Sequence, residues 1–573
     1  MQRPRGFRDI LPAEARRREE IGASVAACFE ASGYGLIETP TIDYYDAVSS
    51  GRTQAQMTHD AFRFVDVDGR LLSLRTDVTL PLARVVAQRF CDVEPPYRLR
   101  YRAEVFREQE SLRGSERQLT QLGIECIGLS GELGDIELLR LALDGVAAAG
   151  IKDVTLHLSD LEVLEALADR AVEVGGLDAN WKAHMRTAAI RGDFIRVREL
   201  VTDAKLPAAL STALVAILDL RGGADALTQA RDLLAAVDVK LPDQVQRLQT
   251  SYQALVAAGF EHQVVIDFSV MPTFEYYTAM VFELYAPCAG PPLGVGGRYD
   301  RLLAEFGRDL PAAGFVYELH LLERALAHQQ IQQQTRQQTL SAPPSSAPPS
   351  VSAAGQTHRK LRIAIPKGTL YPNAIAALRG CDIEVAGLDA PGRTLILVND
   401  EVEIIIAKPS DVAIYVARGA ADCGIGGRDI LMEADFPLLQ LVDLRFGACE
   451  FVVAAPNSET RTLHELSRDL GIVRVATKYP RLAQQYFDDA GISVEIVKLN
   501  GNIELAPLIG IADVIVDITQ TGTTLRENDL RILQYVLPST ARFVANPTMA
   551  RSDRRITKLT DDLKRWVEYA QKN

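Results

Sequence analysis

Apolar and polar residues follow different patterns in the two halves of the chain. Residues 360–573 alternate short apolar runs, among them LRIAIP, VEIIIA and VIVDI, with amphipathic stretches such as 411–418 and 481–490. This alternation is typical of α/β domains with largely parallel sheets. Ligands of such sheets bind beyond the carboxyl ends of the strands, so we expect a binding site there.

Residues 1–328 follow another pattern. Apolar residues three and four positions apart predict helices in 161–172 and 206–248. Strand-like segments lie on both sides of this helical block, at 98–107, 119–129, 264–270 and 279–286. Strands gathered before and after a run of helices indicate an α+β domain, with an antiparallel sheet that carries a helical insertion.

Residues 329–359 separate the two halves. They are rich in Gln, Ser and Pro and have no apolar periodicity, so they cannot bury a core and predict a flexible linker. We therefore expect an N-terminal domain over 1–328, a linker over 329–359 and a C-terminal domain over 360–573, arranged like two proteins fused in one chain.

Composition and charge exclude several classes of protein. A net charge of -13 argues against nonspecific nucleic-acid binding. Apolar runs stay short of the ~20 residues that span a bilayer, and no hydrophobic segment follows the charged start, so we expect neither a membrane partner nor a signal peptide. The seven cysteines form no CxxC pair and no cluster with zinc spacing. We expect free thiols in the cytoplasm and no metal held by the protein alone.

The segment ADVIVDITQTGTTLREN, residues 512–528, has the features of a phosphate-binding loop. An apolar strand ends at Asp517, a Thr-Gly-Thr-Thr turn follows, and helix-forming residues come next. Gly522 permits close backbone approach, threonine hydroxyls can donate to phosphate oxygens, and a carboxylate can accept from sugar hydroxyls. We expect a ribose-5-phosphate site. The alternative is an ordinary helix start with structural threonines.

The surrounding sequence resembles the ATP phosphoribosyltransferase family. The stretch ELAPLIGIADVIVDITQTGTTL at 504–525 is similar to its signature, and 361–370, 408–431, 475–487 and 494–507 agree with it. The resemblance is to the short form and implies a two-lobed α/β phosphoribosyltransferase fold, similar to periplasmic binding proteins. It also implies that N1 of ATP is joined to C1′ of phosphoribosyl pyrophosphate (PRPP), with pyrophosphate expelled in the presence of Mg²⁺. This is the first step of histidine biosynthesis.

The resemblance also implies roles for individual residues. Cationic positions for the phosphates (catalytic) are Lys367, Arg393 and Lys408; the PRPP site is Asp517, Thr521, Gly522, Thr523 and Thr524; and the nucleotide turn is Gly424, Gly426 and Gly427. The three glycines could instead serve packing alone. Lys478 and Lys498 are expected to be solvated surface charges.

Several cations typical of the family are replaced here. Thr369 and Thr523 stand where the family has arginine, Ala448 and Glu450 replace two further cations, and Lys408 stands for arginine. Each lost charge-assisted hydrogen bond costs about 1.5–3 kcal/mol, and lysine does not replace arginine at a bidentate site. The expectation is an active enzyme. The alternative is a non-catalytic regulator with a degenerate transferase site.

The first half resembles histidyl-tRNA synthetase, a class II synthetase. The similar stretches are 4–12, 72–87, 105–110, 117–125, 274–283 and 294–307. Pro272 and Leu321 stand where the synthetase has arginines, and no anticodon-binding domain follows, which argues against aminoacylation. This pattern fits the synthetase-like regulatory subunit that accompanies short-form ATP phosphoribosyltransferase.

The synthetase's amino-acid pocket is largely kept, so the resemblance implies histidine binding and feedback inhibition. The matching positions are Asp77, Thr79, Arg107, Gln121, Glu125, Tyr276 and Tyr277. Carboxylates would hold the α-ammonium and Arg107 the α-carboxylate. The alternative is an inherited scaffold whose groups satisfy one another. Separate subunits of the family form a hetero-octamer, so a fused homotetramer is the simplest expectation.

Overall fold

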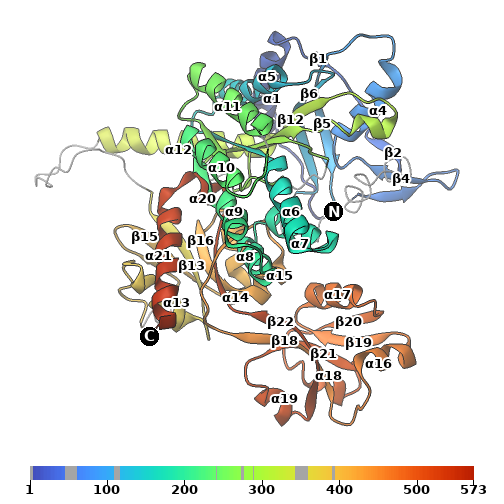
Figure 1. The fold of residues 1–573 in the computed structure, drawn as a ribbon, viewed down its shortest axis with the longest axis vertical. Coiled ribbons are helices and arrows are strands. Elements are labelled where there is room, and N and C mark those ends of the chain that lie inside the picture. Colours follow the sequence, from blue (N-terminus) through green and yellow to red (C-terminus); the bar gives the residue numbers. More distant parts are fainter. Residues whose placement is uncertain are drawn as a thin grey trace, which may run out of the picture. The chain divides into compact units, whose positions relative to one another are not determined.

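The computed structural model describes residues 4–45, 61–108, 116–240, 242–272, 276–287, 290–341, 359–389 and 394–572. The chain divides into two compact units, residues 1–353 and 354–573. Each is described by itself below (Figure 1). Across the described ranges, no helix has both the length and the apolar character needed to cross a membrane.

The first unit is built on a nine-stranded sheet in the order β1-β5-β6-β12-β11-β10-β7-β9-β8. The strand bounds are β1 Gly35–Leu36, β5 Tyr97–Phe106, β6 Gln118–Ile127, β12 Ala312–Glu318, β11 Gly294–Arg298, β10 Met280–Tyr285, β7 Thr155–Asp160, β9 Val264–Asp267 and β8 Arg221–Gly222. Among the described strands of this sheet, the β1–β5 and β7–β9 pairs are parallel and the other pairs antiparallel. The expected antiparallel sheet is therefore confirmed, with two parallel pairs added to it.

Helices surround this sheet, and a smaller sheet extends from it. The helices are α1 Pro12–Ala31, α4 Thr79–Arg89, α5 Glu132–Ala148 and α12 Leu319–Ser341, with a 3-10 turn η1 over Leu303–Phe306. The small sheet has the order β2-β4-β3, with bounds Ile42–Tyr44, Leu71–Leu74 and Arg63–Val65. Helix α12 continues past residue 328, and Gln329 donates to the Gly150 carbonyl at 2.9 Å.

The helical insertion lies between β7 and β9. It comprises α6 Leu161–Gly175, α7 Ala179–Ile190, α8 Phe194–Asp203, α9 Ala208–Asp219, α10 Ala224–Ala235 and α11 Pro242–Ala257. Asp160 begins α6 by accepting from the Glu162 amide, and Gly176 ends it in the left-handed conformation. The apolar stretch 206–248 is divided among α9, α10 and α11. The glycine pair at 222–223 and Pro242, at the start of α11, interrupt helical hydrogen bonding there.

The second unit has two lobes, as expected. The first lobe is a six-stranded sheet, β14-β15-β13-β16-β23-β17, and the second a five-stranded sheet, β20-β19-β21-β18-β22. The first-lobe strands are β13 Leu361–Pro366, β14 Ile396–Val398, β15 Val402–Ala407, β16 Cys423–Gly427, β17 Leu439–Asp443 and β23 Ala541–Ala545. The second-lobe strands are β18 Cys449–Pro456, β19 Val473–Thr477, β20 Val494–Lys498, β21 Val514–Thr519 and β22 Leu530–Ser539.

The chain crosses between the lobes twice, after β17 and after β22. Helices α13 Tyr371–Gly380, α14 Pro409–Ala417, α15 Arg428–Ala434, α20 Pro547–Ser552 and α21 Arg554–Lys572 belong to the first lobe. Helices α16 Leu463–Leu470, α17 Pro480–Asp489, α18 Leu505–Leu508 and α19 Thr523–Glu527 belong to the second. Figure 1 shows the second-lobe helices around their own sheet. Separate apolar cores support the two sheets.

Candidate functional site

Two lysines lie side by side at the carboxyl edge of the first-lobe sheet. Strands β13 and β15 are parallel, with Pro366 paired to Ala407. Lys367 and Lys408 are the next residues on each strand, and the Lys367 amide donates to the Ala407 carbonyl at 2.7 Å. Both residues are exposed. The edge thus presents two ammonium groups on neighbouring strands, an arrangement suited to a polyphosphate.

The third expected cation, Arg393, lies outside the described residues. Thr369, in the loop after Lys367, is exposed, and Ala448 is exposed in the first crossing between the lobes. Glu450 lies in β18, directly across from Thr519 of β21. The positions where cations are missing therefore border the same strand ends as the residues that are present.

The three glycines expected in a nucleotide turn lie in a central strand instead. Gly424, Gly426 and Gly427 belong to β16, which pairs with β13 on one side and β23 on the other. A Cβ on Gly424 would lie 2.7 Å from the Ala364 carbonyl, so close packing requires glycine there. The segment expected to be a turn is therefore a strand, and the backbones of its neighbouring strands pack closely against it. Gly427 ends β16 at the carboxyl edge, where it precedes α15.

Asp517 and Lys478 form the corresponding edge of the second lobe. Strands β19 and β21 are parallel, with Thr477 paired to Val516, so Lys478 and Asp517 are the next residues on neighbouring strands. The Lys478 ammonium lies 3.7 Å from Asp517 Oδ2. Burial raises the pKa of Asp517, and the Lys478 charge opposes that rise. The expectation that Lys478 is a surface charge missed this pairing, which the parallel alignment of VRVAT with VIVDI could have indicated.

The threonine loop after Asp517 is tied together by its own side chains. The Gly522 amide donates to Thr519 Oγ1 at 2.9 Å, and the Thr521 and Thr523 hydroxyls are 2.9 Å apart. Gly522 has φ +68°, which favours glycine because other residues are strained there. Thr521, Thr523 and Thr524 are exposed. The loop therefore presents several hydroxyls to solvent in a defined arrangement.

A cation lies next to this loop although the motif lacks its usual arginine. Arg526, one turn into α19, donates from Nη2 to Thr523 Oγ1 at 3.2 Å. The guanidinium is exposed and has further donors free of this bond. Sequence reasoning did not single out Arg526. Its spacing of three residues from Thr523 on a helix is the signal that could have found it.

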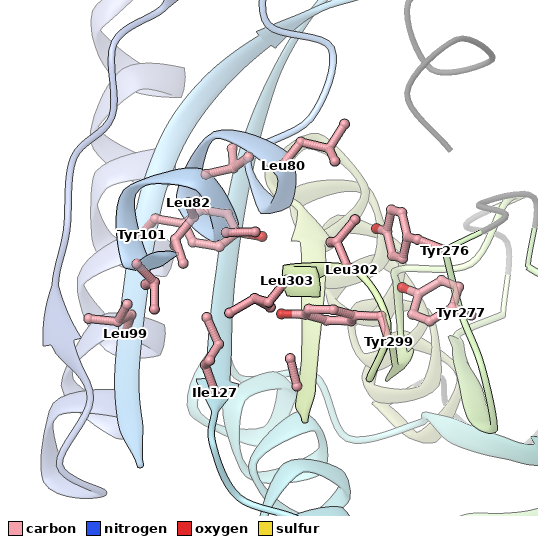
Figure 2. Close-up of a cluster of buried hydrophobic side chains, with 14 of the residues drawn as sticks. Leu80, Leu82, Leu99, Tyr101, Ile127, Tyr276, Tyr277, Tyr299, Leu302 and Leu303 are labelled. Carbon is pink, nitrogen blue, oxygen red and sulfur yellow. The ribbon is translucent and has the colours of Figure 1, made fainter. Parts of the chain in front are cut away.

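In the first unit, a buried carboxylate is surrounded by hydroxyl groups. Thr79 donates to Glu125 Oε1 at 2.8 Å, Tyr101 donates to the same oxygen at 3.4 Å, and Tyr299 donates to Oε2. Figure 2 shows Tyr101 and Tyr299 entering the same cluster from different elements. Burial raises the pKa of Glu125 to about 8, an effect that the hydroxyl donors oppose. Gly314 is required beside this carboxylate, because a Cβ there would lie 1.7 Å from Oε2.

The other expected pocket residues gather around Glu125. Asp77 is buried, its Oδ1 accepts from the Leu80 amide at 3.1 Å, and burial raises its pKa. Tyr276 and Tyr277 pack with ring centroids 4.8 Å apart, and Tyr276 also contacts the Tyr299 ring (Figure 2). Tyr101 and Tyr299 belong to the same buried cluster, although sequence reasoning did not name them.

Gln121 lies on β6, four residues before Glu125, and is almost fully buried. Its Oε1 has no hydrogen-bond partner among the residues that the structure describes. A buried amide oxygen without a partner is unfavourable by about 1–3 kcal/mol. Gln121 Oε1 is thus suited to accept a hydrogen bond from a ligand.

Arg107 is occupied by a partner within the chain. Its Nη1 lies 3.3 Å from Glu318 Oε1, and its Nε donates to the Thr76 carbonyl at 3.3 Å. Glu318 ends β12, three residues before Leu321, which is buried. Pro272 is buried as well. The guanidinium expected to hold a ligand carboxylate is therefore paired with a carboxylate of the protein.

Across the ranges described above, no cluster of three or more His, Cys, Asp or Glu side chains could hold a metal ion. The described cysteines, including buried Cys126 and Cys423, are free thiols.

Comparisons with known proteins match both halves of the chain. A model of the histidyl-tRNA synthetase family matches residues 6–322, and a model of the ATP phosphoribosyltransferase family matches 408–565. The chain is 34% identical over 323 residues to the ATP phosphoribosyltransferase regulatory subunit of Moorella thermoacetica, covering 56% of this chain and 81% of that protein. It is 46% identical over 188 residues to the ATP phosphoribosyltransferase of Rubrobacter xylanophilus, covering 33% and 87%.

A solved structure is similar over most of the chain. The ATP phosphoribosyltransferase regulatory subunit/histidyl-tRNA synthetase from Bacillus halodurans aligns with a TM-score of 0.52 and 26% identity. The alignment covers 71% of this chain and 92% of that one.

Proposed function

The chain belongs to the family of ATP phosphoribosyltransferase regulatory subunits through its first half and to the ATP phosphoribosyltransferase family through its second, and we propose that histidine bound in the first unit controls catalysis in the second. The enzyme joins N1 of ATP to C1′ of PRPP and releases pyrophosphate, at the start of histidine biosynthesis. The class II synthetase-like fold and the two-lobed transferase fold agree with this membership.

The proposed chemistry needs positioning more than acid–base catalysis. Adenine N1 carries its own lone pair, which forms the new bond to C1′ while the C1′–oxygen bond breaks and its electron pair leaves with pyrophosphate. No general base is required for the attack. Catalysis then depends on aligning two polyanions and on stabilising the departing charge. Cations and hydrogen-bond donors at the strand ends are the groups that can do both.

The observation that carries the site assignment is the complementarity of the two strand edges. The first-lobe edge has adjacent cations, Lys367 and Lys408. The second-lobe edge has a buried acid, Asp517, beside a loop of hydroxyls. In the proposed complex Asp517 accepts from the ribose hydroxyls, Thr521, Thr523 and Thr524 donate to the 5-phosphate, and the lysines contact the polyphosphate groups.

Arg526 and Lys478 provide charge that the altered motif lacks. The Arg526 guanidinium already bonds to Thr523, so it can contact a phosphate held by that hydroxyl. The Lys478 ammonium lies 3.7 Å from Asp517 Oδ2, and its proposed role is to orient Asp517 and to contact the leaving pyrophosphate. These contacts support an active enzyme over a degenerate, purely regulatory one. Gly426 and Gly427 stay proposed as nucleotide neighbours, and Gly424 has a sufficient explanation in packing.

Mg²⁺ is proposed to arrive with the substrates. The described part of the second unit offers Asp517 and neighbouring carboxylates singly, not as a three-ligand group. Mg²⁺ keeps several waters and binds substrate phosphates readily, so these residues fit an ion carried by PRPP. The ion would neutralise charge on the leaving pyrophosphate.

Histidine is proposed to bind around Glu125. The buried carboxylates Asp77 and Glu125 would hold the α-ammonium, and the unpartnered Gln121 Oε1 would accept from a ligand donor, such as the imidazole N–H. Tyr276 and Tyr277 would form the apolar wall. For Arg107 to hold the ligand carboxylate, its ion pair with Glu318 must open. Histidine then regulates only through a difference in affinity between conformations or assemblies.

One assay tests both claims. Purified full-length protein is given ATP, PRPP and Mg²⁺, and phosphoribosyl-ATP is measured with and without histidine. We expect product that histidine suppresses. Absence of product under every condition would instead favour the non-catalytic regulator. Product unaffected by histidine would remove only the regulatory claim. The protein is also proposed to be cytoplasmic and to form a homotetramer. Its mass in solution, measured on the same sample, tests the tetramer.

A further inference from the structure

One buried carboxylate connects the two lobes of the transferase. Asp429 lies in α15 of the first lobe and is 6% exposed. Ser539, the last residue of β22, donates from Oγ to Asp429 Oδ1 at 2.9 Å and accepts from the Asp429 amide at 3.1 Å. Tyr479, in the second lobe, donates its hydroxyl to Asp429 Oδ2 at 3.1 Å. One carboxylate oxygen of Asp429 is thus held by the second lobe, through Tyr479. The other is held by Ser539, where β22 leads back to the first lobe.

Asp429 and Tyr479 lie one or two residues along the chain from residues of the proposed substrate site. Asp429 is two residues beyond Gly427, at the carboxyl end of β16. Tyr479 follows Lys478, whose ammonium lies 3.7 Å from Asp517. The Tyr479 amide donates to Thr477 Oγ1 at 2.9 Å, and its ring packs edge-on against Phe451, with centroids 5.0 Å apart. Backbone and ring are therefore held within the second lobe, and the hydroxyl bonds to the first lobe.

A second contact between the same two helices keeps this geometry in register. Glu433 of α15 accepts from the Leu482 amide at 3.0 Å and from the Arg481 amide at 3.3 Å, so the first lobe caps α17 of the second. Arg481 donates in return to the Met432 carbonyl at 2.7 Å. The start of α17, including Tyr479, is therefore attached to the first lobe at several points.

We propose that Tyr479 and Asp429 are positioning residues that hold the PRPP half of the site at the distance from the nucleotide half that the reaction requires. This inference rests on the proposed transferase function. In-line attack needs N1 and C1′ about 3–3.5 Å apart, and a misplacement of about 1 Å can lower the rate ~100-fold. On the proposed assignment the ribose 5-phosphate contacts the second lobe and the nucleotide mainly the first, so loosening the junction slows reaction more than it weakens the binding of either substrate.

The test compares Tyr479→Phe with wild type and with Tyr486→Phe. The first variant keeps the ring against Phe451 and removes only the hydroxyl. The control removes the hydroxyl of Tyr486, a tyrosine within α17, whose ring packs on Phe487 and whose hydroxyl forms no hydrogen bond to the described residues. We expect Tyr479→Phe to lower kcat about 10-fold to 100-fold, with both KM values changed less than about threefold. Tyr486→Phe should match wild type.

The outcomes separate the two claims. A wild-type protein without turnover overturns the proposed function and this inference with it. An active wild type with an equally active Tyr479→Phe overturns only the inference. A rise in both KM values together with a lower melting temperature and an unchanged kcat also overturns the inference, because a merely structural contact would give that result. Should Tyr479→Phe not fold, Ser539→Ala removes the other side-chain donor to Asp429 and is expected to give the same fall in kcat.

Discussion

The guanidinium of Arg526 donates a hydrogen bond to the hydroxyl of Thr523, at 3.2 Å. Thr523 stands where the family motif has arginine. Because Arg526 lies beside it, the loop still has a cation despite this substitution. The positive charge comes instead from one helical turn further along the chain, and the threonine hydroxyl lies between it and the other hydroxyls of the loop.

Arg526→Met is expected to weaken PRPP binding. The exposed guanidinium provides a charge-assisted contact to phosphate, and losing such a contact is unfavourable by about 1.5–3 kcal/mol at most. Solvent screening reduces this, so we expect KM for PRPP to rise about 5-fold to 10-fold, with KM for ATP unchanged. Steady-state kinetics against each substrate measure this. Arg468→Met, an exposed change in α16 of the same lobe, is the control. Equal KM values for PRPP in wild type and Arg526→Met would contradict the assignment.

Asp517→Asn is expected to reduce kcat/KM for PRPP at least about 100-fold, because the amide cannot replace a carboxylate that accepts from two ribose hydroxyls. The fold should survive. Burial raises the pKa of Asp517, so its charge does not favour the folded state at neutral pH, and the melting temperature should be unchanged or higher. Asp489→Asn, at the exposed end of α17, is the control. Full activity of Asp517→Asn would show that the loop does not bind ribose.

Histidine affinity is expected to increase with pH. Burial raises the pKa of Glu125 from its ordinary value of 4.5 to about 8, so below pH 8 the folded protein holds a proton on this group. An α-ammonium bound beside it favours the carboxylate, so binding releases that proton and strengthens from pH 6.5 to 8.5. Titration calorimetry in buffers of different ionisation enthalpy measures both effects. Glu125→Gln should abolish the dependence, while Glu173→Gln, on the surface of α6, should keep it.

The same proton has an effect on folding. Since the folded-state pKa of Glu125 is raised, its contribution to stability is complete below the unfolded value of 4.5 and is lost as pH rises through about 8. Thermal unfolding of the first unit should therefore move to lower temperature over that range.

A wild-type protein whose histidine affinity is the same at pH 6.5 and 8.5 would exclude Glu125 from the ligand site.

Glu318→Gln is expected to strengthen histidine binding and feedback inhibition. The change removes the negative charge that occupies Arg107, at 3.3 Å, and leaves the guanidinium available to a ligand carboxylate. The pair is partly exposed, so its energy is about 1 kcal/mol or less, and we expect about a threefold to fivefold gain in affinity. Arg107→Met should have the opposite effect. Calorimetry on the full-length chain distinguishes the two; weaker binding by Glu318→Gln would show that Glu318 itself contacts the ligand.

Much of this protein follows from local sequence patterns. Alternating apolar runs predicted the α/β unit, strands around a helical block predicted the other, and the Asp517–Thr524 segment indicated a phosphate loop. These features depend on short-range periodicity and turn chemistry, which a single sequence carries. Strand β16 at Gly424–Gly427 was harder to predict, because a glycine that permits a turn and one that permits two strands to pack look alike in sequence.

Only the tertiary structure decided which distant residues act together. Lys478 is exposed, as expected of a surface charge, but only the parallel pairing of β19 and β21 shows that it lies 3.7 Å from Asp517. Arg107 is expected from the sequence to hold a ligand carboxylate, and only the structure shows that β12 brings Glu318 to it from 211 residues away. Asp429 and Tyr479 lie in segments that resemble the family, but nothing in the sequence pairs them with each other or with Ser539. The sequence by itself determined the two families, the fold of each half and the chemical groups available. Strand register and the approach of the two lobes decided their partners, because the charge and hydrogen bonding of a buried group depend on neighbours that chain spacing does not specify.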